Sequence, residues 1–326
     1  MTHPRLFAAS CPDKPAIVMA DSGETLSYRA LELSANRYAQ AFRRQGLKSG
    51  DCVAVWLENG PDLLQIYWAV QRAGLYLLPI PVHLQAEEAA YLLKDSDAAL
   101  LFVSPKVRQA AKLVGTLCSK LPELRKIVAV RGPVSDAQTV QNWLEGCPSV
   151  PIVDETAGRH FVYSSGTTGR PKGIRMALTG NSPTEPDSIS ERLAEQYGLD
   201  GTSLFLCPAP LYHTAPLVFS TTIHRMGGTV VVMPGFEAEA TLAAIERFRI
   251  SATFMVPTMF QRLLRLPEDV RLRHDLSSLR CVIHAAAPCP VATKHQMIAW
   301  FGPILWEFYS GSEGAGSTVI DSHEWL

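Results

Sequence analysis

One segment of the sequence has residue types suited to binding a polyphosphate. Between the apolar stretch 161–163 and Lys172 lie six small residues: Ser164, Ser165, Gly166, Thr167, Thr168 and Gly169. Glycine permits positive φ and close approach, so such a loop can turn several backbone N–H groups toward one point. A lysine at its end adds a point charge for phosphate oxygens. The segment therefore predicts a phosphate-binding loop.

The spacing of this loop differs from that of a Walker A motif. In that motif the lysine directly follows a glycine and precedes Ser or Thr. Here Lys172 lies three residues after Gly169 and precedes Gly173, which argues against a generic NTPase. An ordinary flexible Ser/Gly linker is the plain alternative. The apolar run before the loop and the Arg-Pro-Lys-Gly sequence at its end favour a binding loop.

Short apolar runs alternate with amphipathic segments along the chain and supply the scaffold for this loop. The run 52–57 is continuously apolar, which predicts a strand covered on both faces. Pro61 then suits a first helical position, and Gly74 suits the helix end. Further strands are expected at 75–80, 98–103, 126–130, 229–233, 251–256, 281–285 and 304–309. Further helices are expected near 106–121, 237–249, 258–266 and 291–300.

Alternation of strand and helix predicts an α/β fold. It implies right-handed crossovers and mainly parallel sheets flanked by helices. The length of 326 residues favours two domains. A polar stretch at 131–157, rich in Gly, Pro, Ser, Asp and Glu, places their boundary so that they span 1–150 and 151–326.

Composition narrows the class of protein. Apolar residues make up 47% of the chain and charged residues 19%, as in globular proteins. The net charge of −1 argues against nucleic-acid binding. No apolar run is long enough for a transmembrane segment, and the N-terminus does not resemble a secretory signal. The seven scattered cysteines, without CxxC pairs, predict reduced thiols and a cytoplasmic protein, and the nine histidines lack metal-ligand spacing.

The sequence YSSGTTGRPKG closely resembles the signature loop of the adenylate-forming (AMP-binding) superfamily. That superfamily includes acyl- and aryl-CoA synthetases, adenylation domains of nonribosomal peptide synthetases and firefly luciferase. The segments LCPAPLYHTAPL, HAAAPCP and ILWEFYSGSEG resemble its later motifs and occur in the same order, and KPAIVMADSGETLSYRALELSANRYAQAF resembles its opening. The likeness covers nearly the whole chain. It implies the layered αβαβα fold of the large N-terminal domain, with the small C-terminal domain absent.

The resemblance assigns roles to the residues of the first two motifs. The loop residues Ser164, Ser165, Gly166, Thr167, Thr168 and Gly169 would hold the β and γ phosphates of ATP together with Lys172. Thr167 and Thr168 would be the hydroxyl contacts. His213, which follows Tyr212, would border the carboxylate of the acid substrate. A packed loop histidine is the structural alternative for His213.

The last two motifs would hold the rest of the nucleotide. The residues implied at the adenine or its boundary with the acyl group are Ala286, Ala287, Pro288, Glu307, Phe308, Tyr309, Ser310, Gly311 and Ser312. By the resemblance Tyr309 would stack on the base and Ser312 would bind the α-phosphate. Glu313 would hold Mg²⁺, with Thr167 as a second ligand. A solvated carboxylate is the alternative for Glu313, although its place after an apolar run suits the ligand-binding edge of an α/β sheet.

The sequence departs from the family pattern at one turn. The family usually has glycine directly after the tyrosine and threonine before the glutamate, whereas this chain has Ser310, Gly311 and Ser312. The hydroxyl is kept and the glycine is displaced by one position. The turn should therefore differ from the family's. The residues expected to act in catalysis remain Lys172, His213 and Glu313.

The resemblance implies ATP-dependent activation of a carboxylic acid, through an acyl-AMP, to a CoA thioester. Amino-acid adenylating domains have an aspartate near the position of His213, and CPAPLYHTAP has none. A plain acid is therefore favoured. The apolar segment LVFSTTIHRMGG fits a helix along an acyl tunnel, which suggests a medium- or long-chain fatty acid or a steroid side-chain acid. An aryl acid is the second choice.

Other interpretations remain open at this stage. The chain could belong to another adenylating enzyme, such as a peptide-synthetase module or a luciferase-like oxygenase, or be a truncated inactive nucleotide-binding paralogue. It ends at HEWL without a recognisable cap. We therefore expect a truncated protein that lacks the family's ribose-binding aspartate and adenylation lysine, binds nucleotide weakly and turns over poorly. The resemblance also suggests a homodimer.

Overall fold

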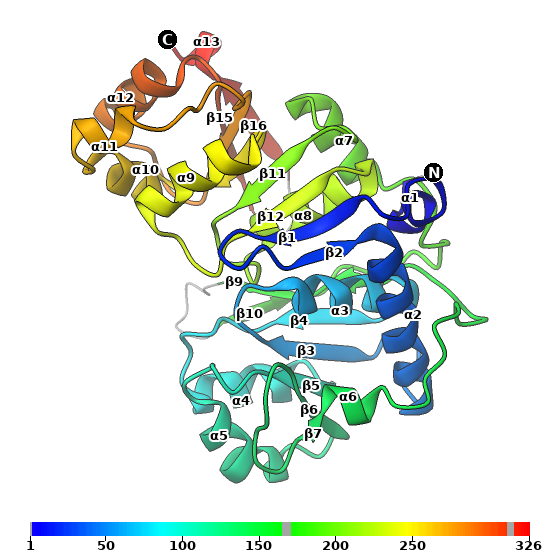
Figure 1. Ribbon diagram of the computed structural model, residues 1–326. Coiled ribbons are helices and arrows are strands. Elements are labelled where there is room, and N and C mark those ends of the chain that lie inside the picture. Colours follow the sequence, from blue (N-terminus) through cyan, green and yellow to red (C-terminus); the bar gives the residue numbers. More distant parts are fainter. Residues whose placement is uncertain (1, 165–170, 312–315) are drawn as a thin grey trace. The chain divides into compact units, whose positions relative to one another are not determined.

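A computed structural model describes residues 2–164, 171–311 and 316–326, except the side chains of residues 117, 118 and 164 (Figure 1). The chain packs into two compact units. Unit 1 comprises Met1–Lys14, Ser27–Pro186 and Leu211–His213, and unit 2 comprises Pro15–Leu26, Asp187–Pro210 and Thr214–Leu326. The division at residue 150 made from the sequence stays a prediction.

Unit 1 is built on a parallel sheet with the strand order β7-β6-β5-β3-β4-β8. Its strands are β3 (Cys52–Trp56), β4 (Tyr76–Pro79), β5 (Ala98–Val103), β6 (Lys126–Ala129), β7 (Gln138–Thr139) and β8 (Arg159–His160). The three strands β3, β4 and β5 are buried along their whole length. Their continuous apolar runs explain this, because both faces of the sheet are covered.

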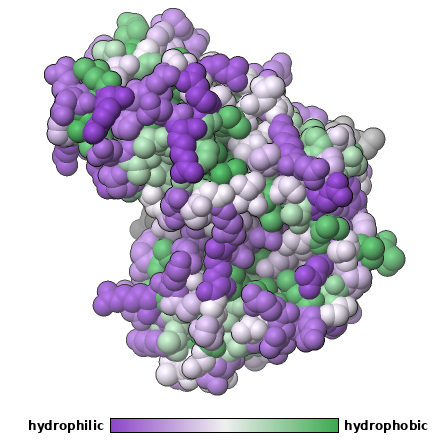
Figure 2. Space-filling model, in the orientation of Figure 1, coloured by the Kyte–Doolittle hydropathy of each residue, from purple (hydrophilic) through white to green (hydrophobic). Residues whose placement is uncertain are grey.

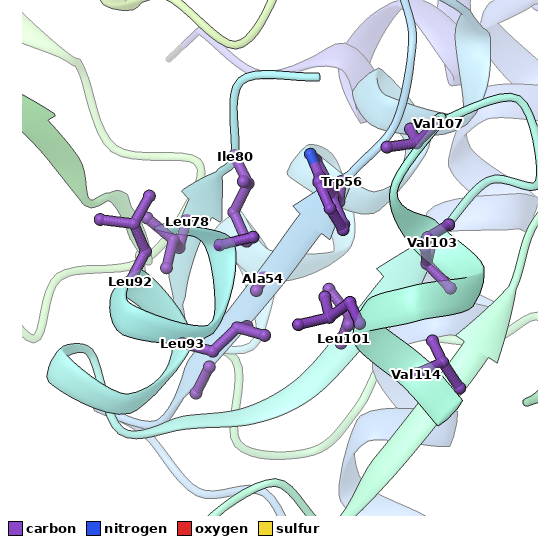
Figure 3. Packing of buried hydrophobic residues seen from close by; sticks show 14 of the residues in the cluster. Ala54, Trp56, Leu78, Ile80, Leu92, Leu93, Leu101, Val103, Val107 and Val114 are labelled. Atoms are coloured by element: carbon purple, nitrogen blue, oxygen red, sulfur yellow. The ribbon is translucent and has the colours of Figure 1, made fainter. Parts of the chain in front are cut away.

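Most helices of unit 1 begin with a side-chain cap or a proline in the first turn. They are α1 (Pro4–Ser10), α2 (Tyr28–Arg44), α3 (Pro61–Arg72), α4 (Ala86–Asp95), α5 (Ala110–Lys112) and α6 (Val140–Trp143). Ser27 caps α2 through its side chain, and Pro61 occupies the first turn of α3. Leu92 and Leu93 of α4 pack into the buried cluster formed with β3, β4 and β5 (Figure 3).

The continuous helix expected at 106–121 is wrong. The structure has only the short α5 there, followed by a π-helical turn at Leu113–Leu117 and a 3₁₀ turn at Cys118–Lys120. Gly115 lies in the π-helical turn and carries the low helix propensity that disfavours a regular α-helix. Hydrophobic spacing alone did not reveal this interruption.

Unit 2 contains an eight-stranded sheet in the order β16-β15-β14-β13-β11-β12-β1-β2. Its strands are β1 (Pro15–Met19), β2 (Thr25–Ser27), β11 (Leu204–Cys207), β12 (Thr229–Val232), β13 (Ala252–Met255), β14 (Cys281–His284), β15 (Leu305–Ser310) and β16 (Ser317–Asp321). The ladders from β1 through β12, β11, β13 and β14 to β15 are parallel, whereas β16 is antiparallel to β15. The predicted α/β class with mainly parallel sheets is confirmed, and the antiparallel edge strand was not anticipated.

The helices of unit 2 cover this sheet. They are α7 (Ser188–Tyr197), α8 (Thr214–Met226), α9 (Ala238–Phe248), α10 (Pro257–Leu264), α11 (Glu268–Leu272), α12 (Val291–Phe301) and α13 (Ser322–Trp325). Phe219 of α8 packs on Phe254 and Phe308, with ring centroids 5.8 and 6.1 Å away. The apolar segment expected to be a helix is therefore helical, and Phe219 belongs to the core of the unit.

The face of the protein in Figure 2 has the mixed surface of a globular protein. Hydrophilic residues are interspersed with hydrophobic ones on the face shown in Figure 2.

Among the described residues, no helix combines the length and the apolar character needed to cross a membrane. The six cysteines whose side chains are described are free thiols.

Candidate functional site

The predicted phosphate loop joins the two strands of a hairpin in unit 1. β9 (Val162–Ser164) and β10 (Lys172–Ile174) are antiparallel, and Ser164 pairs with Lys172 in the register. Lys172 is exposed as the first residue of β10. The intervening residues 165–170, which include Thr167 and Thr168, lie outside the described residues. The structure therefore confirms the strand before the loop and shows where its lysine lies.

The hairpin continues from the edge of the unit 1 sheet. β8 pairs with β4, and the next residue, Phe161, donates its N–H to Leu77 O at 2.7 Å. The rings of Phe161 and Tyr163 stack at 5.2 Å. Gly173 on β10 lies against them, so that a Cβ added there would be 2.7 Å from Phe161 Cε2. A side chain at this position would force the aromatic rings to move, which favours glycine after Lys172.

A second set of contacts holds the far end of β10. The Arg175 guanidinium lies 4.2 Å from the centre of the Tyr76 ring and donates a hydrogen bond to Gly50 O. The Tyr76 hydroxyl donates to Met176 O at 2.7 Å. The hairpin that carries the phosphate loop is thereby fastened to β4 of the main sheet.

His213 lies in a short segment that packs on the carboxyl end of the unit 1 sheet. The Leu211 N–H donates to Asn59 Oδ1 at 2.8 Å, just beyond β3. The Tyr212 ring lies 4.7 Å from that of His213 and 6.1 Å from that of His83. Desolvation by the surrounding protein and, secondly, the nearby His83 lower the pKa of His213, although its side chain stays open to solvent. Its imidazole is therefore neutral at neutral pH.

Sequence reasoning missed two polar residues in this region. His83 follows β4, and Glu58 follows β3. Both carboxylate oxygens of Glu58 are buried and lack a hydrogen-bond partner among the described residues. The signal that could have found His83 and Glu58 is their place after apolar strands, since ligands of parallel sheets bind at the carboxyl ends of strands.

In unit 2, the alanine turn after β14 has an unusual backbone. Ala286 has φ of 76°, in the left-handed region that favours glycine. Ala286, Ala287 and Pro288 are exposed. Such strain in a non-glycine residue costs about 1 kcal/mol or more and is found preferentially at functional sites. The position of this turn fits a binding role.

Glu307 of β15 belongs to a buried charged cluster that sequence reasoning did not predict. Lys294 of α12 places its Nζ 2.6 Å from Glu307 Oε2, and the lysine side chain is 1% exposed. His284 Nε2 lies 4.0 Å from the same oxygen. Burial lowers the pKa of His284 to about 4, even though the Glu307 charge opposes this shift. The ring is thus neutral, and neither nitrogen has a hydrogen-bond partner among the described residues.

The end of β15 separates core from surface residues. Phe308 faces the aromatic core, whereas Tyr309 is 82% exposed and free to stack on a flat ligand. The Ser310 hydroxyl donates to Gly316 O at 2.9 Å and bridges the turn to β16. Gly311 is exposed. The predicted residues Ser312 and Glu313 lie outside the described residues, so the effect of the displaced glycine on them stays a prediction.

The structure thus divides the predicted site residues between the two units. Lys172 and His213 belong to unit 1, and the segments 286–288 and 307–311 belong to unit 2. In the part of the chain that the structure describes, no group of three His, Cys, Asp or Glu could hold a metal ion. The predicted metal ligands Thr167 and Glu313 are outside that part.

Comparison with known proteins gives a consistent assignment. The family model of the AMP-binding enzymes matches residues 5–325. The medium/long-chain-fatty-acid–CoA ligase FadD8 of Mycobacterium tuberculosis is 30% identical over 312 residues, which cover 92% of this chain and 52% of that protein. Feruloyl-CoA synthase of Amycolatopsis sp is 32% identical over 285 residues, which cover 84% and 52%. The chain spans about half the length of these curated relatives.

Solved structures share the fold. A putative long-chain-fatty-acid CoA ligase from Rhodopseudomonas palustris CGA009 has a TM-score of 0.83 at 23% identity, over 98% of this chain and 77% of that one. The N-terminal domain of FACL13 from Mycobacterium tuberculosis also has a TM-score of 0.83, at 21% identity, over 99% and 79%. With a family match over nearly its whole length, the chain belongs to the AMP-binding enzymes of the adenylate-forming superfamily.

Proposed function

We propose that this chain is the nucleotide- and acid-binding part of an AMP-forming acid–CoA ligase. The observation that carries the proposal is the β9–β10 hairpin, which presents Lys172 directly after the family's signature loop. Its small residues suit phosphate, and its stem is fastened to a parallel sheet. The two curated relatives named above support this proposal, because one is named as a fatty-acid–CoA ligase and the other as a feruloyl-CoA synthase.

The proposed reaction has two halves. The acid carboxylate attacks the α-phosphorus of ATP, which forms acyl-AMP and releases pyrophosphate. The CoA thiolate then attacks the acyl carbonyl and releases AMP. The first half requires alignment and charge stabilisation rather than covalent protein chemistry. Lys172 and the loop Ser164–Gly169 would stabilise the charge on the departing pyrophosphate, and neutral His213 would border the carboxylate without adding a competing charge.

Residues of unit 2 would bind the nucleoside part. Exposed Tyr309 would stack on the adenine, and Ala286 to Pro288 and the segment from Glu307 to Ser312 would border it. Glu313 and Thr167 have the hard oxygen donors that Mg²⁺ prefers and would hold this ion. When bound, Mg²⁺ supplies positive charge to the phosphates. These residue roles remain proposals.

A medium- or long-chain fatty acid, or a steroid side-chain acid, is the proposed substrate. The absence of an aspartate in CPAPLYHTAP supports a plain acid over an amino acid. An aryl acid is the second candidate, because feruloyl-CoA synthase is among the similar proteins. The free thiols support the proposal of a cytoplasmic location, and a homodimer is proposed from the family resemblance alone.

Pyrophosphate release across a panel of fatty, steroid, aryl and amino acids tests this function. We expect acid-dependent release and a CoA thioester product from the protein encoded by the complete gene, with fatty or steroid acids preferred. The 326-residue chain assayed in parallel tests the proposal that it turns over poorly alone. Loss of nucleotide binding in Lys172→Ala is expected. Release restricted to amino acids, or ATP binding unaffected by Lys172→Ala, would contradict the proposal.

A further inference from the structure

The stem of the phosphate hairpin makes a hydrogen bond to a helix far away in the sequence. The Tyr163 hydroxyl donates to Asp95 Oδ2 at 2.7 Å. Tyr163 lies on β9, one residue before the loop begins, and Asp95 is the last residue of α4. No motif joins these two residues, which are separated by 68 positions.

Asp95 is held in position by the helix to which it belongs, α4 of unit 1. Its helix begins with a capping box, in which Gln85 and Glu88 bond each other's backbone N–H groups. Leu92 and Leu93, on the last turn before Asp95, are buried in the core cluster with β3, β4 and β5 (Figure 3). The carboxylate at the end of α4 is therefore held by a well-packed element.

The hairpin needs such an external anchor. β9 and β10 form a two-stranded sheet of their own, and a two-stranded hairpin is marginally stable by itself in water. The bond from Phe161 to Leu77 and the Arg175 contacts hold the base of the stem. The hydrogen bond from Tyr163 to Asp95 lies nearer the loop, so it constrains the position of Lys172 more directly.

A chain of close contacts leads from Asp95 to the lysine. Gly173 pairs with Tyr163 in the register, and a Cβ on Gly173 would lie 3.2 Å from Tyr163 Cζ. The Tyr163 ring therefore limits where β10 can lie. Lys172 directly precedes Gly173 on β10, so a shift of the Tyr163 ring shifts the lysine.

We propose that Asp95 is a positioning residue for polyphosphate binding, which acts through its hydrogen bond to Tyr163 to hold Lys172 in place on β10. This inference rests on the proposed function of the loop. It adds a residue that lies outside every motif of the family resemblance. Its specific consequence concerns ligands with β and γ phosphates, because the adenosine and α-phosphate contacts are assigned to residues of unit 2.

The test compares ATP, inorganic pyrophosphate and AMP binding to the chain by calorimetry. Tyr163→Phe keeps the ring that packs on Phe161 and Gly173 and removes only the donor. Asp95→Ala removes the acceptor. We expect each variant to bind ATP and pyrophosphate about three- to tenfold more weakly, the effect of one lost hydrogen bond. AMP affinity should stay within about twofold of that of the unmodified chain.

Two further variants separate positioning from general damage. Asp95→Asn keeps an acceptor oxygen and should restore ATP affinity to near the original value. The double variant Tyr163→Phe/Asp95→Ala should be no weaker than either single variant, because both remove the same bond. Circular dichroism and thermal unfolding of each variant confirm that the compared proteins are folded.

The possible results are distinct. Equal losses for AMP and ATP, or equal losses for Asp95→Asn and Asp95→Ala, would overturn the positioning role. Additive losses in the double variant would overturn the coupling of the two residues. If the unmodified chain binds neither ATP nor pyrophosphate, the proposed function itself fails, and this inference fails with it.

Discussion

Lys294 and Glu307 form an ion pair in which the lysine side chain is almost completely removed from solvent. Their charged atoms are 2.6 Å apart, on α12 and β15. The Trp325 ring lies 4.6 Å from Lys294 Nζ and closes another side of the ammonium group. The pair therefore fixes the carboxylate of β15 shortly before Tyr309, the residue proposed to stack on the base.

Removing the lysine should destabilise the protein strongly. Lys294→Met keeps much of the side-chain volume but leaves Glu307 without its close cation, at a cost of about 3 kcal/mol. Urea unfolding followed by circular dichroism measures the change. The double variant Lys294→Met/Glu307→Gln should recover part of the loss, because no unpaired charge remains. A single variant as stable as the original would show that the pair contributes little.

A substitution at Ala286, by contrast, should increase the stability of the protein. Ala286→Gly should stabilise the protein by about 0.5–1 kcal/mol, because glycine adopts the left-handed region without the steric penalty of alanine. Ala287→Gly is the matched control, and it should lower stability because only chain entropy changes. Urea midpoints compare the two. The idea of strain at residue 286 is wrong if both substitutions destabilise equally.

Buried His224 should make the protein sensitive to mild acid. Burial lowers its pKa to about 4, although a hydrogen bond between Nε2 and Ala16 O opposes this. The unfolded histidine titrates near 6.5 and binds protons first, so this contribution is present above pH 6.5 and is lost as the pH falls toward 4. The loss is about 2 kcal/mol by pH 5.

Denaturant unfolding between pH 7 and pH 5 measures this effect. His224→Gln should have a flatter stability profile than the original chain, whatever its stability at pH 7. His323→Gln replaces an exposed histidine and should leave the slope unchanged. An unchanged slope in His224→Gln would assign the acid sensitivity to other groups.

Gly173 should tolerate no side chain. Gly173→Ala places a Cβ 2.7 Å from Phe161 Cε2 and forces the stacked rings to move, which should cost about 1–3 kcal/mol and weaken ATP binding. Gly235→Ala is the control, since nothing lies within 4 Å of its added Cβ. Thermal unfolding and calorimetry report the two effects. Phe161→Leu combined with Gly173→Ala should recover ATP affinity in part if the ring is the obstacle.

Much of the scaffold was predictable because its strands are continuous apolar runs. The run 98–103 matches β5, and the other predicted strands differ from the structure by one residue at their ends. The prediction of a helix at 106–121 was wrong because hydrophobic spacing does not reveal the interruption around Gly115. The antiparallel β16 was missed because no strand was predicted after 304–309.

For the candidate site, the motifs name residues but not the contacts that hold their elements in place. The strand before the loop was predicted from local sequence, whereas the hairpin strand that begins with Lys172 was not. The contacts of Tyr163 with Asp95 and of Lys294 with Glu307 join separate elements. Such contacts arise from packing, which no local pattern encodes. The roles assigned to the motif residues themselves stay predictions.

The pairing of β1 with β12 means that the unit 2 sheet can be completed only late in synthesis. Ile17 lies beside Val230 in the sheet of unit 2, so β1 must await a neighbour that is made more than two hundred residues later. Closing so large a loop is slow compared with local pairing. A piece that begins at residue 187 would leave the β12 edge without its N-terminal neighbour, open to pairing between chains.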